Sequence, residues 1–337
     1  MARWHSFNRP SGFRPRRRGG NPWWRCGWPS FPGAPTSLGD AIAEELGVIP
    51  GCRTIERYPG GERHVELQES VRGADVYLVQ PTCPPVETNL VELLLLADCC
   101  RRAGSAHITA VIPYFGYGRQ DRRGGLRVPV GGRLVADLIA ASGVQRVVAV
   151  DLHAPAMEGY FAMPVEHLAA FPALCGVLRD TIAANGVVVA PDLGAAKLAD
   201  RYATELHLPV AVVHKTRTSG ADVIVTGITG DVRGKVPLIV DDMITTGSTI
   251  AAAVEALLIA GAEARITVLA THGVFEPEAF DRLRRLPIER IIISDSVPPP
   301  ADSALPIEVV HLAPLLAEAI RLMLMGGAGR LLARPRL

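Results

Sequence analysis

The sequence predicts an α/β protein with two related domains, each a mainly parallel sheet flanked by helices. Its 337 residues are long for one core and comfortable for two, at roughly 100–200 residues each. Short apolar runs alternate with helical patterns, which is typical of strands buried on both faces of a parallel sheet. A segment of the first half is also repeated, in diverged form, in the second half.

The expected elements follow one another in regular alternation. Each expected strand is a run of aliphatic and β-branched residues, and these runs lie at 74–80, 107–114, 146–153, 186–192, 235–242 and 264–273. Each expected helix repeats its apolar residues every three or four positions, and these patterns lie at 86–104, 130–143, 195–206 and 248–262. The alternation predicts successive βαβ units.

The repeat aligns Val71-Arg72-Gly73 with Val232-Arg233-Gly234, and later matches keep the same order. Chance similarity between two βαβ units is the simpler explanation, but the ordered matches favour two related domains. The copies differ at one loop, where the first reads QPTCPPVETN and the second reads VDDMITTGST. If the scaffold was duplicated, the chemistry of this loop was kept in the C-terminal half.

Residues 1–32 form a basic, Trp-rich segment without helical or strand periodicity. Residues 1–30 contain seven arginines, no acid and all four tryptophans of the chain. We expect a poorly ordered extension, or a start assigned too far upstream. The alternative is a basic, aromatic arm that binds nucleic acid, although the net charge of +1 gives no general indication of a nucleic-acid or membrane partner.

Cysteine usage and hydropathy predict a cytoplasmic protein. The six cysteines show no CxxC spacing, and Cys99 and Cys100 are neighbours inside an expected helix, as suits reduced core thiols. No apolar run reaches 18 residues, and no signal-peptide pattern is present, so we expect no membrane span.

The loop VDDMITTGST suggests a site for a sugar phosphate. Asp241 and Asp242 end an expected strand, where ligands of open parallel sheets bind. The next residues lead into an expected helix, whose free N–H groups can bind phosphate. Their hydroxyl groups supply further donors, and the glycine lets the backbone approach the phosphate closely. These residues are Thr245, Thr246, Gly247, Ser248 and Thr249. The carboxylates suit sugar hydroxyls or Mg²⁺ instead. The alternative is a capped helix after two solvated acids.

This loop resembles the phosphoribosyl-diphosphate motif of type I phosphoribosyltransferases and of ribose-phosphate pyrophosphokinases. Further segments resemble the second family in order, from about residue 38 to 325: PYFGYGRQDR, VDLHAPAMEGYF, APDLGAAKLA and VVHKTRTSG. The resemblance implies two phosphoribosyltransferase-like domains, at 33–160 and 161–306, the second carrying the ribose 5-phosphate loop. A C-terminal helix at about 307–325 is expected to pack back on the first domain.

The resemblance implies a ribose-phosphate diphosphokinase, which uses ATP and ribose 5-phosphate with Mg²⁺ to make 5-phosphoribosyl 1-diphosphate and AMP. It assigns the 5-phosphate to residues 245–249 and the ribose hydroxyls to Asp241 and Asp242. His153 and Asp192 would hold the metal, and His153 also counts among the expected catalytic residues. The other expected catalytic residues, on a mobile loop, are Lys215 and Arg217. The residues expected to bind ATP are Tyr58, Glu62, Arg119, Gln120 and Asp121.

Two positions depart from the family pattern. Gly60 stands in YPGGE where the family has an acid, which removes an acceptor for the adenine amino group. Thr245 replaces the Asp of many members, and its hydroxyl can still donate to a phosphate. The family also implies a homo-oligomer in which a neighbouring subunit completes the ATP site. The alternatives are a regulatory paralogue with weak catalysis and a phosphoribosyltransferase.

Overall fold

The computed structural model describes residues 37–179, 181–219, 222–300 and 304–324, with the side chains of 216–224 left out. The predicted extension at 1–32 lies outside the described residues. The chain enters the fold at α1 (Leu38–Leu46), whose first turn is closed by a reciprocal capping box between Ser37 and Asp40. No helix in the described part of the chain is long and apolar enough to cross a membrane.

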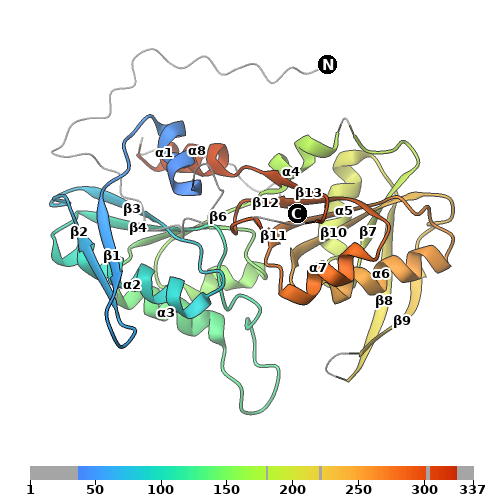
Figure 1. The fold of residues 1–337 in the computed structure, drawn as a ribbon, viewed down its shortest axis with the longest axis horizontal. Helices are drawn as coiled ribbons and strands as arrows, with labels where there is room; N and C mark the ends of the chain where they lie inside the picture. Colours follow the sequence, from blue (N-terminus) through green and yellow to red (C-terminus); the bar gives the residue numbers. More distant parts are fainter. Residues whose placement is uncertain (1–36, 180, 220–221, 301–303, 325–337) are drawn as a thin grey trace.

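The N-terminal domain is built on a four-stranded parallel sheet in the order β3-β4-β5-β6 (Figure 1). Its strands are β3 (Asp75–Val79), β4 (His107–Ile112), β5 (Arg146–Val150) and β6 (Val165–Leu168). Its helices are α2 (Val86–Arg102), α3 (Gly131–Ala141) and the 3₁₀ turn η1 (Pro155–Tyr160). An antiparallel hairpin, β1 (Arg53–Arg57) and β2 (Arg63–Leu67), packs on α2.

The C-terminal domain is built on a seven-stranded sheet in the order β13-β12-β11-β10-β7-β8-β9, in which only the edge strand β9 is antiparallel to its neighbour. The strands are β7 (Gly186–Ala190), β8 (Val210–Ser219), β9 (Asp222–Thr229), β10 (Val236–Ile244), β11 (Ile266–Gly273), β12 (Ile288–Ser294) and β13 (Ile307–Val310). The helices are α4 (Phe171–Leu178), α5 (Ala196–Leu206), α6 (Ser248–Ile259) and α7 (Pro277–Arg284).

The two sheets share one apolar core and each has a second core of its own. The shared core joins both sheets to α1, α4, α5 and α8 (Ala313–Leu324). Helices α2 and α3 cover the other face of the N-terminal sheet, while α6 and α7 cover the other face of the C-terminal sheet (Figure 1). The predicted fold class, with parallel sheets flanked by helices, is therefore confirmed.

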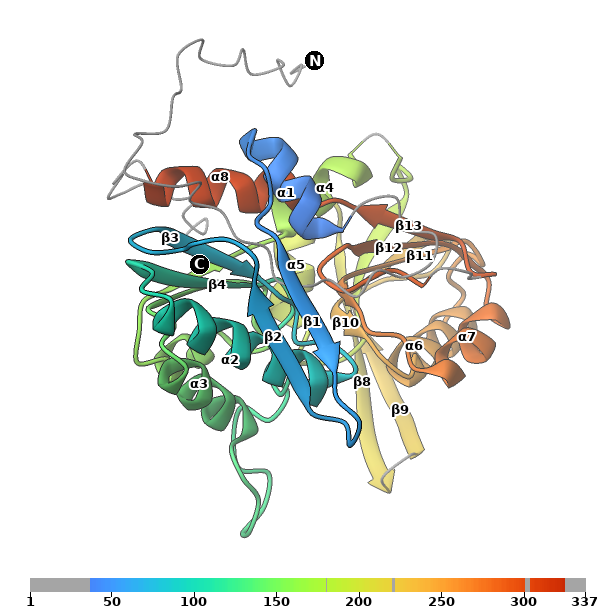
Figure 2. The same cartoon turned by 60° about the vertical axis from the view of Figure 1, so that its left-hand side comes forward.

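The chain's last described helix returns to its first. Helix α8 packs on α1, and the Arg321 guanidinium donates to the Glu45 carbonyl (Figure 2). The helix expected at about 307–325 begins only at Ala313, because the β-branched run before it pairs with β12 as β13. The division at residue 160 stays a prediction, but β6 pairs with β5, so the N-terminal sheet continues to Leu168.

The repeat in the sequence corresponds to a repeat in the structure. Gly73 (φ 72°) and Gly234 (φ 66°) both form left-handed turns, which glycine adopts without steric cost. Their N–H groups donate to the Gly104 and Gly261 carbonyls, at 2.8 Å in both copies. Each turn leads into a strand, a helix and a parallel strand, β3-α2-β4 and β10-α6-β11. Equivalent backbone bonds support two related domains.

Candidate active site

The predicted phosphate loop, residues 245–249, connects the end of β10 to the start of α6. Gly247 precedes α6 in the left-handed conformation, with φ of 70°. The N–H groups of the first turn of a helix have no partners within it, so they face the loop with the positive end of the helix dipole. The Thr246 and Ser248 hydroxyls lie 3.1 Å apart on the same loop. This arrangement can bind a phosphate.

Helix α7 supports the phosphate loop from behind. The Arg282 guanidinium donates to the Thr246 carbonyl, and Leu283 lies under Gly247, where a Cβ would come within 3.2 Å of the Leu283 side chain. The Thr245 carbonyl accepts from the Glu276 N–H at 3.2 Å, so this residue is held through its backbone. The hydroxyl of Thr245 is therefore not required to shape the loop.

Gly247→Ala is expected to weaken ribose 5-phosphate binding by about tenfold or more, since the left-handed conformation costs an L-residue roughly 1–2 kcal/mol and the new methyl meets Leu283. Isothermal titration with ribose 5-phosphate measures the effect. Gly176→Ala is the matched control, because Gly176 lies in α4 with open space around its Cβ. Equal affinities of the two variants would contradict the assigned role of the loop.

Asp241 and Asp242 lie side by side near the carboxyl end of β10. The Asp242 N–H donates to Asp241 Oδ1 at 2.9 Å. Burial, together with the charges of Asp242 and Asp192, raises the pKa of Asp241 well above its usual value. Burial acts in the same direction on Asp242, but the hydrogen bond and charge of His153 outweigh it and lower the pKa of Asp242. The pair therefore offers one ionised carboxylate and one that resists ionisation.

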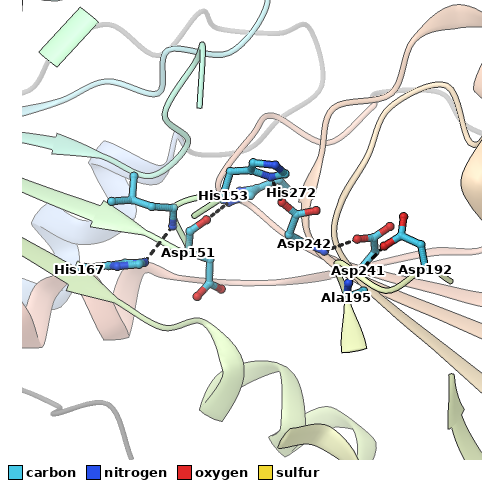
Figure 3. Close-up of polar contacts among 9 residues, drawn as sticks. Asp151, His153, His167, Asp192, Ala195, Asp241, Asp242 and His272 are labelled. Carbon is cyan, nitrogen blue, oxygen red and sulfur yellow. Dashed lines mark hydrogen bonds and ion pairs between the residues drawn. The ribbon is translucent and has the colours of Figure 1, made fainter. Parts of the chain in front are cut away.

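His153 joins the two domains at this site. It follows β5 of the N-terminal sheet, and its Nδ1 lies 2.5 Å from Asp242 Oδ2 of the C-terminal sheet (Figure 3). The hydrogen bond with Asp242 raises the pKa of His153. Arg119 and Asp121 are near enough to act electrostatically on His153. Residues predicted to bind ATP (Arg119 and Asp121) and the sugar (Asp242) therefore both act on His153, which is predicted to bind the metal.

Lys215 links two other predicted segments. Its Nζ lies 2.6 Å from Asp192 Oδ2 and donates to Thr249 Oγ1 at 3.1 Å, and the Lys215 side chain is only 9% exposed. The other Asp192 oxygen accepts from the Ala195 N–H at 3.2 Å, which fixes the carboxylate. The ammonium therefore connects the loop after β7 with the phosphate loop.

The segment predicted to begin a mobile loop is a strand in the structure. Lys215 lies within β8, which continues to Ser219 and pairs with β9. The reason is a run of β-branched residues on both strands, which favours a hairpin. Arg217 lies in β8, but its side chain is outside the described part of the chain.

The residues predicted to bind ATP are divided between two places. Arg119, Gln120 and Asp121 lie on the loop between β4 and α3, near His153. Tyr58 and Glu62 lie at the turn of the β1–β2 hairpin, on the outer side of the N-terminal domain (Figure 1). The exposed Tyr58 ring stacks on His64, with centroids 5.2 Å apart. The two groups of predicted ATP residues therefore lie on separate elements of the N-terminal domain.

The carboxylates of Asp192, Asp241 and Asp242 fit a magnesium site that substrate phosphates and water would complete. Among the described side chains, no group of three or more His, Cys, Asp or Glu is already arranged to hold a metal ion. Mg²⁺, however, needs only one or two carboxylates when phosphate oxygens and water supply the rest. The raised pKa of Asp241, caused by burial and by its neighbours Asp242 and Asp192, marks a place where a cation would relieve repulsion.

A buried polar group near His153, made by Asp151, Thr271 and His272, was not predicted from the sequence. Asp151 Oδ2 accepts from the Thr271 hydroxyl at 2.7 Å, and His272 Nε2 lies 3.1 Å from the Asp151 carbonyl (Figure 3). Thr271 and His272 are almost fully buried on β11. The two adjacent polar residues inside an otherwise apolar strand were the available signal, because buried polar groups need partners.

The fold and the site define a two-domain enzyme of the phosphoribosyltransferase type, with a phosphate loop after an acidic strand end. Comparisons with known proteins agree. Residues 33–143 match the model of the N-terminal domain of ribose phosphate pyrophosphokinase, and residues 176–282 match the phosphoribosyl transferase domain. The chain belongs to the ribose-phosphate pyrophosphokinase family.

Relatives that align with most of the chain are named ribose-phosphate pyrophosphokinase. The chain is 45% identical to a ribose-phosphate pyrophosphokinase of Caldanaerobacter subterraneus subsp. tengcongensis, covering 84% of this chain and 90% of that one. It is also 45% identical to the Rhodopirellula baltica protein of that name, covering 84% and 91%. The crystal structure of phosphoribosylpyrophosphate synthetase from Mycobacterium smegmatis superposes with a TM-score of 0.82, at 35% identity, covering 90% and 99%. These similarities support the enzyme over the alternatives of a regulatory paralogue and a phosphoribosyltransferase.

Proposed function

We propose that this chain transfers the terminal diphosphoryl group of ATP to the 1-hydroxyl of ribose 5-phosphate, releasing AMP. The observation that carries this is the His153–Asp242 contact of 2.5 Å, which brings the segment resembling an ATP-metal site onto the predicted ribose site. A phosphoribosyltransferase, which consumes the diphosphate sugar, needs no ATP site. Here the two predicted substrate sites lie against each other across the domain junction.

The sugar is held by the C-terminal domain. The N–H and hydroxyl groups of residues 245–249 bind its 5-phosphate, and Asp242 accepts from a ribose hydroxyl. Asp241, whose pKa is raised by burial and by its acidic neighbours, serves the sugar as a weakly ionised partner of Asp242. Thr245 presents a neutral hydroxyl to the phosphate, which avoids placing a third acid beside it.

The nucleotide is held from the opposite side. Arg119, Gln120 and Asp121 contact ATP, with His153 and Asp192 at the metal that accompanies its phosphates. When bound, Mg²⁺ neutralises charge on the diphosphoryl group. The 1-oxygen of the sugar forms a new bond to the β-phosphorus, the bond from that phosphorus to the oxygen bridging to the α-phosphorus breaks, AMP leaves with that oxygen and the bonding pair, and the proton of the 1-hydroxyl passes to solvent. Lys215 stabilises the negative charge that develops on the transferring diphosphoryl group.

Release of AMP from Mg-ATP and ribose 5-phosphate tests the proposed function. Purified chain should form AMP and 5-phosphoribosyl 1-diphosphate in equal amounts, measured by chromatography. Omission of ribose 5-phosphate should stop AMP formation. Absence of AMP, with binding to an active relative, would instead support a regulatory paralogue. Formation of AMP by ATP hydrolysis alone would contradict the transfer.

We further propose a homo-oligomer in which the hairpin turn of a neighbouring subunit completes the ATP site. The support is that Tyr58 and Glu62 lie at the turn of the β1–β2 hairpin, on the outer side of the N-terminal domain, whereas His153 follows β5 and contacts Asp242 at the domain junction. The Tyr58 ring is 46% exposed, as a residue that stacks on an adenine of another subunit would be. Mixing an inactive Tyr58 variant with an inactive Lys215 variant should restore part of the activity.

Nucleotide selection is expected to be weak. Gly60 has φ of 103°, a conformation that L-residues rarely adopt, so this turn is built for glycine and offers no side-chain acceptor to adenine. Discrimination between ATP and GTP should be about 10²-fold or less in kcat/KM, as for sites that do not pair the distinguishing group. Steady-state kinetics with ATP, GTP and CTP measure this, and a much stronger ATP preference would contradict it.

A further inference from the structure

Asp151 has the features of a fixed anchor between the two domains. It follows β5 directly, two residues before His153, and has a positive φ of 39° that is unusual for a residue with a side chain. Its Oδ2 accepts from the Ala170 N–H at 3.1 Å and from the Thr271 hydroxyl at 2.7 Å. A residue held in this conformation requires surrounding contacts that determine it.

His272 makes a second bond to the same residue. The Asp151 carbonyl can only accept a hydrogen bond, so His272 Nε2, 3.1 Å away, carries the proton and donates it. The Nδ1 atom lies 2.8 Å from the Ser296 hydroxyl, which fixes the plane of the ring from its other side. The Tyr114 ring of the N-terminal domain packs edge-on against the His272 ring, with centroids 5.1 Å apart.

Thr271 and His272 lie on β11, the strand next to β10, which carries Asp241 and Asp242. On neighbouring strands, Asp241 is paired with Ala270 and Met243 with His272. One strand thus presents the acid that contacts His153, while the next strand holds the backbone from which His153 projects. The Ser294 hydroxyl donates to the Thr271 carbonyl at 2.6 Å, so Thr271 is itself fixed.

We infer that Thr271 and His272 are positioning residues, which hold Asp151 and thereby set His153 against Asp242 for the nucleotide half of the reaction. This inference rests on the proposed function. Both residues act through Asp151 and His153, and the hydrogen bonds of their side chains go to Asp151 and Ser296 rather than to residues 245–249 of the ribose 5-phosphate loop. A contact that merely joins the domains would affect both substrates equally.

Thr271→Val tests this inference because it removes only the hydroxyl donor. The affinity for Mg²⁺ with a non-hydrolysable ATP analogue, measured by calorimetry, should fall about tenfold, the lower end of the effect of losing a direct partner of a metal-binding histidine, because Thr271 acts on His153 only through Asp151. Affinity for ribose 5-phosphate should change less than about twofold. Thr271→Ser keeps the hydroxyl and should restore analogue binding, which separates the hydrogen bond from packing.

A second pair of variants guards against misfolding at this buried position. His272→Gln can place an amide near the Nε2 position, whereas His272→Asn is too short to reach the Asp151 carbonyl. We expect kcat/KM for ATP to fall further in the Asn variant, with melting temperatures of both recorded. Equal losses for both substrates, or no difference within each pair, would overturn the inference. A wild-type chain that forms no AMP would overturn the proposed function instead, while the calorimetric comparison would still test the positioning role.

Discussion

Replacement of Lys215 by alanine should lower kcat by about 10³-fold, the scale of removing a charge that acts on a transferring phosphoryl group. In the structure this ammonium lies 2.6 Å from Asp192 and 3.1 Å from Thr249, so it stands between the predicted nucleotide and sugar sites. Ribose 5-phosphate affinity should fall by less than about tenfold, because only one hydrogen bond to the phosphate loop is lost. Single-turnover kinetics and calorimetry separate the two effects.

The matched control is Lys235→Ala. Lys235 precedes β10 at the end remote from the site and pairs at 3.2 Å with the exposed Asp231, a contact of small energetic value. Its turnover should be close to that of the unmodified chain. Near-normal turnover of the Lys215 variant would show that the assignment of this residue is wrong. A loss of ribose 5-phosphate binding equal to the loss of turnover would assign it to the sugar instead.

Asp241→Asn is expected to lower kcat/KM by about 10²-fold while stabilising the free protein by about 1 kcal/mol, the size of a typical stabilising substitution. Burial and the neighbouring acids raise the pKa of Asp241, so its charge opposes folding at neutral pH. Asparagine keeps an oxygen for the Asp242 N–H and removes this charge. Thermal unfolding without ligands measures the gain.

The stability gain of Asp241→Asn should depend on pH. A raised pKa in the folded state destabilises the protein above the unfolded pKa, and the penalty disappears below it, so the gain of Asp241→Asn should vanish near about pH 4. Asp242→Asn is the opposite control, because the partner His153 helps to lower the pKa of Asp242, and its charge therefore stabilises the fold at neutral pH. If both variants shifted the melting temperature in the same direction at neutral pH, the opposite pKa shifts assigned to Asp241 and Asp242 would be contradicted.

The predictions from sequence succeeded where the information is local. The apolar run before Asp241 and the small residues after it predict a strand, a short loop and a helix, and the structure has them in that order. The sequence did not indicate the length of β8, since Lys215 resembled the start of a loop, whereas pairing with β9 makes it part of a hairpin. Strand pairing of this kind depends on a partner segment as much as on the residues themselves.

Contacts across the domain junction were beyond sequence reasoning for a different reason. The 2.5 Å approach of His153 to Asp242 depends on how two sheets are oriented, and 89 positions separate the two residues. Asp151 was part of a quoted motif, but its unusual backbone conformation and its bond to Thr271 follow from packing between domains. The resemblance implied that a neighbouring subunit completes the ATP site through the segment of Tyr58 and Glu62, and this stays a prediction; in the structure the two residues lie at the turn of the β1–β2 hairpin.

The return of α8 to α1 has a consequence for how the chain is made. Glu45 and Arg321 are 276 positions apart, yet their contact closes the core shared by both sheets. During synthesis, the face of α1 that packs on α8 stays uncovered until α8 has left the ribosome, because α8 is synthesised long after α1. The first domain to be synthesised is thus completed last, and a chain that stops before Ala313 exposes apolar surface that binds chaperones or aggregates.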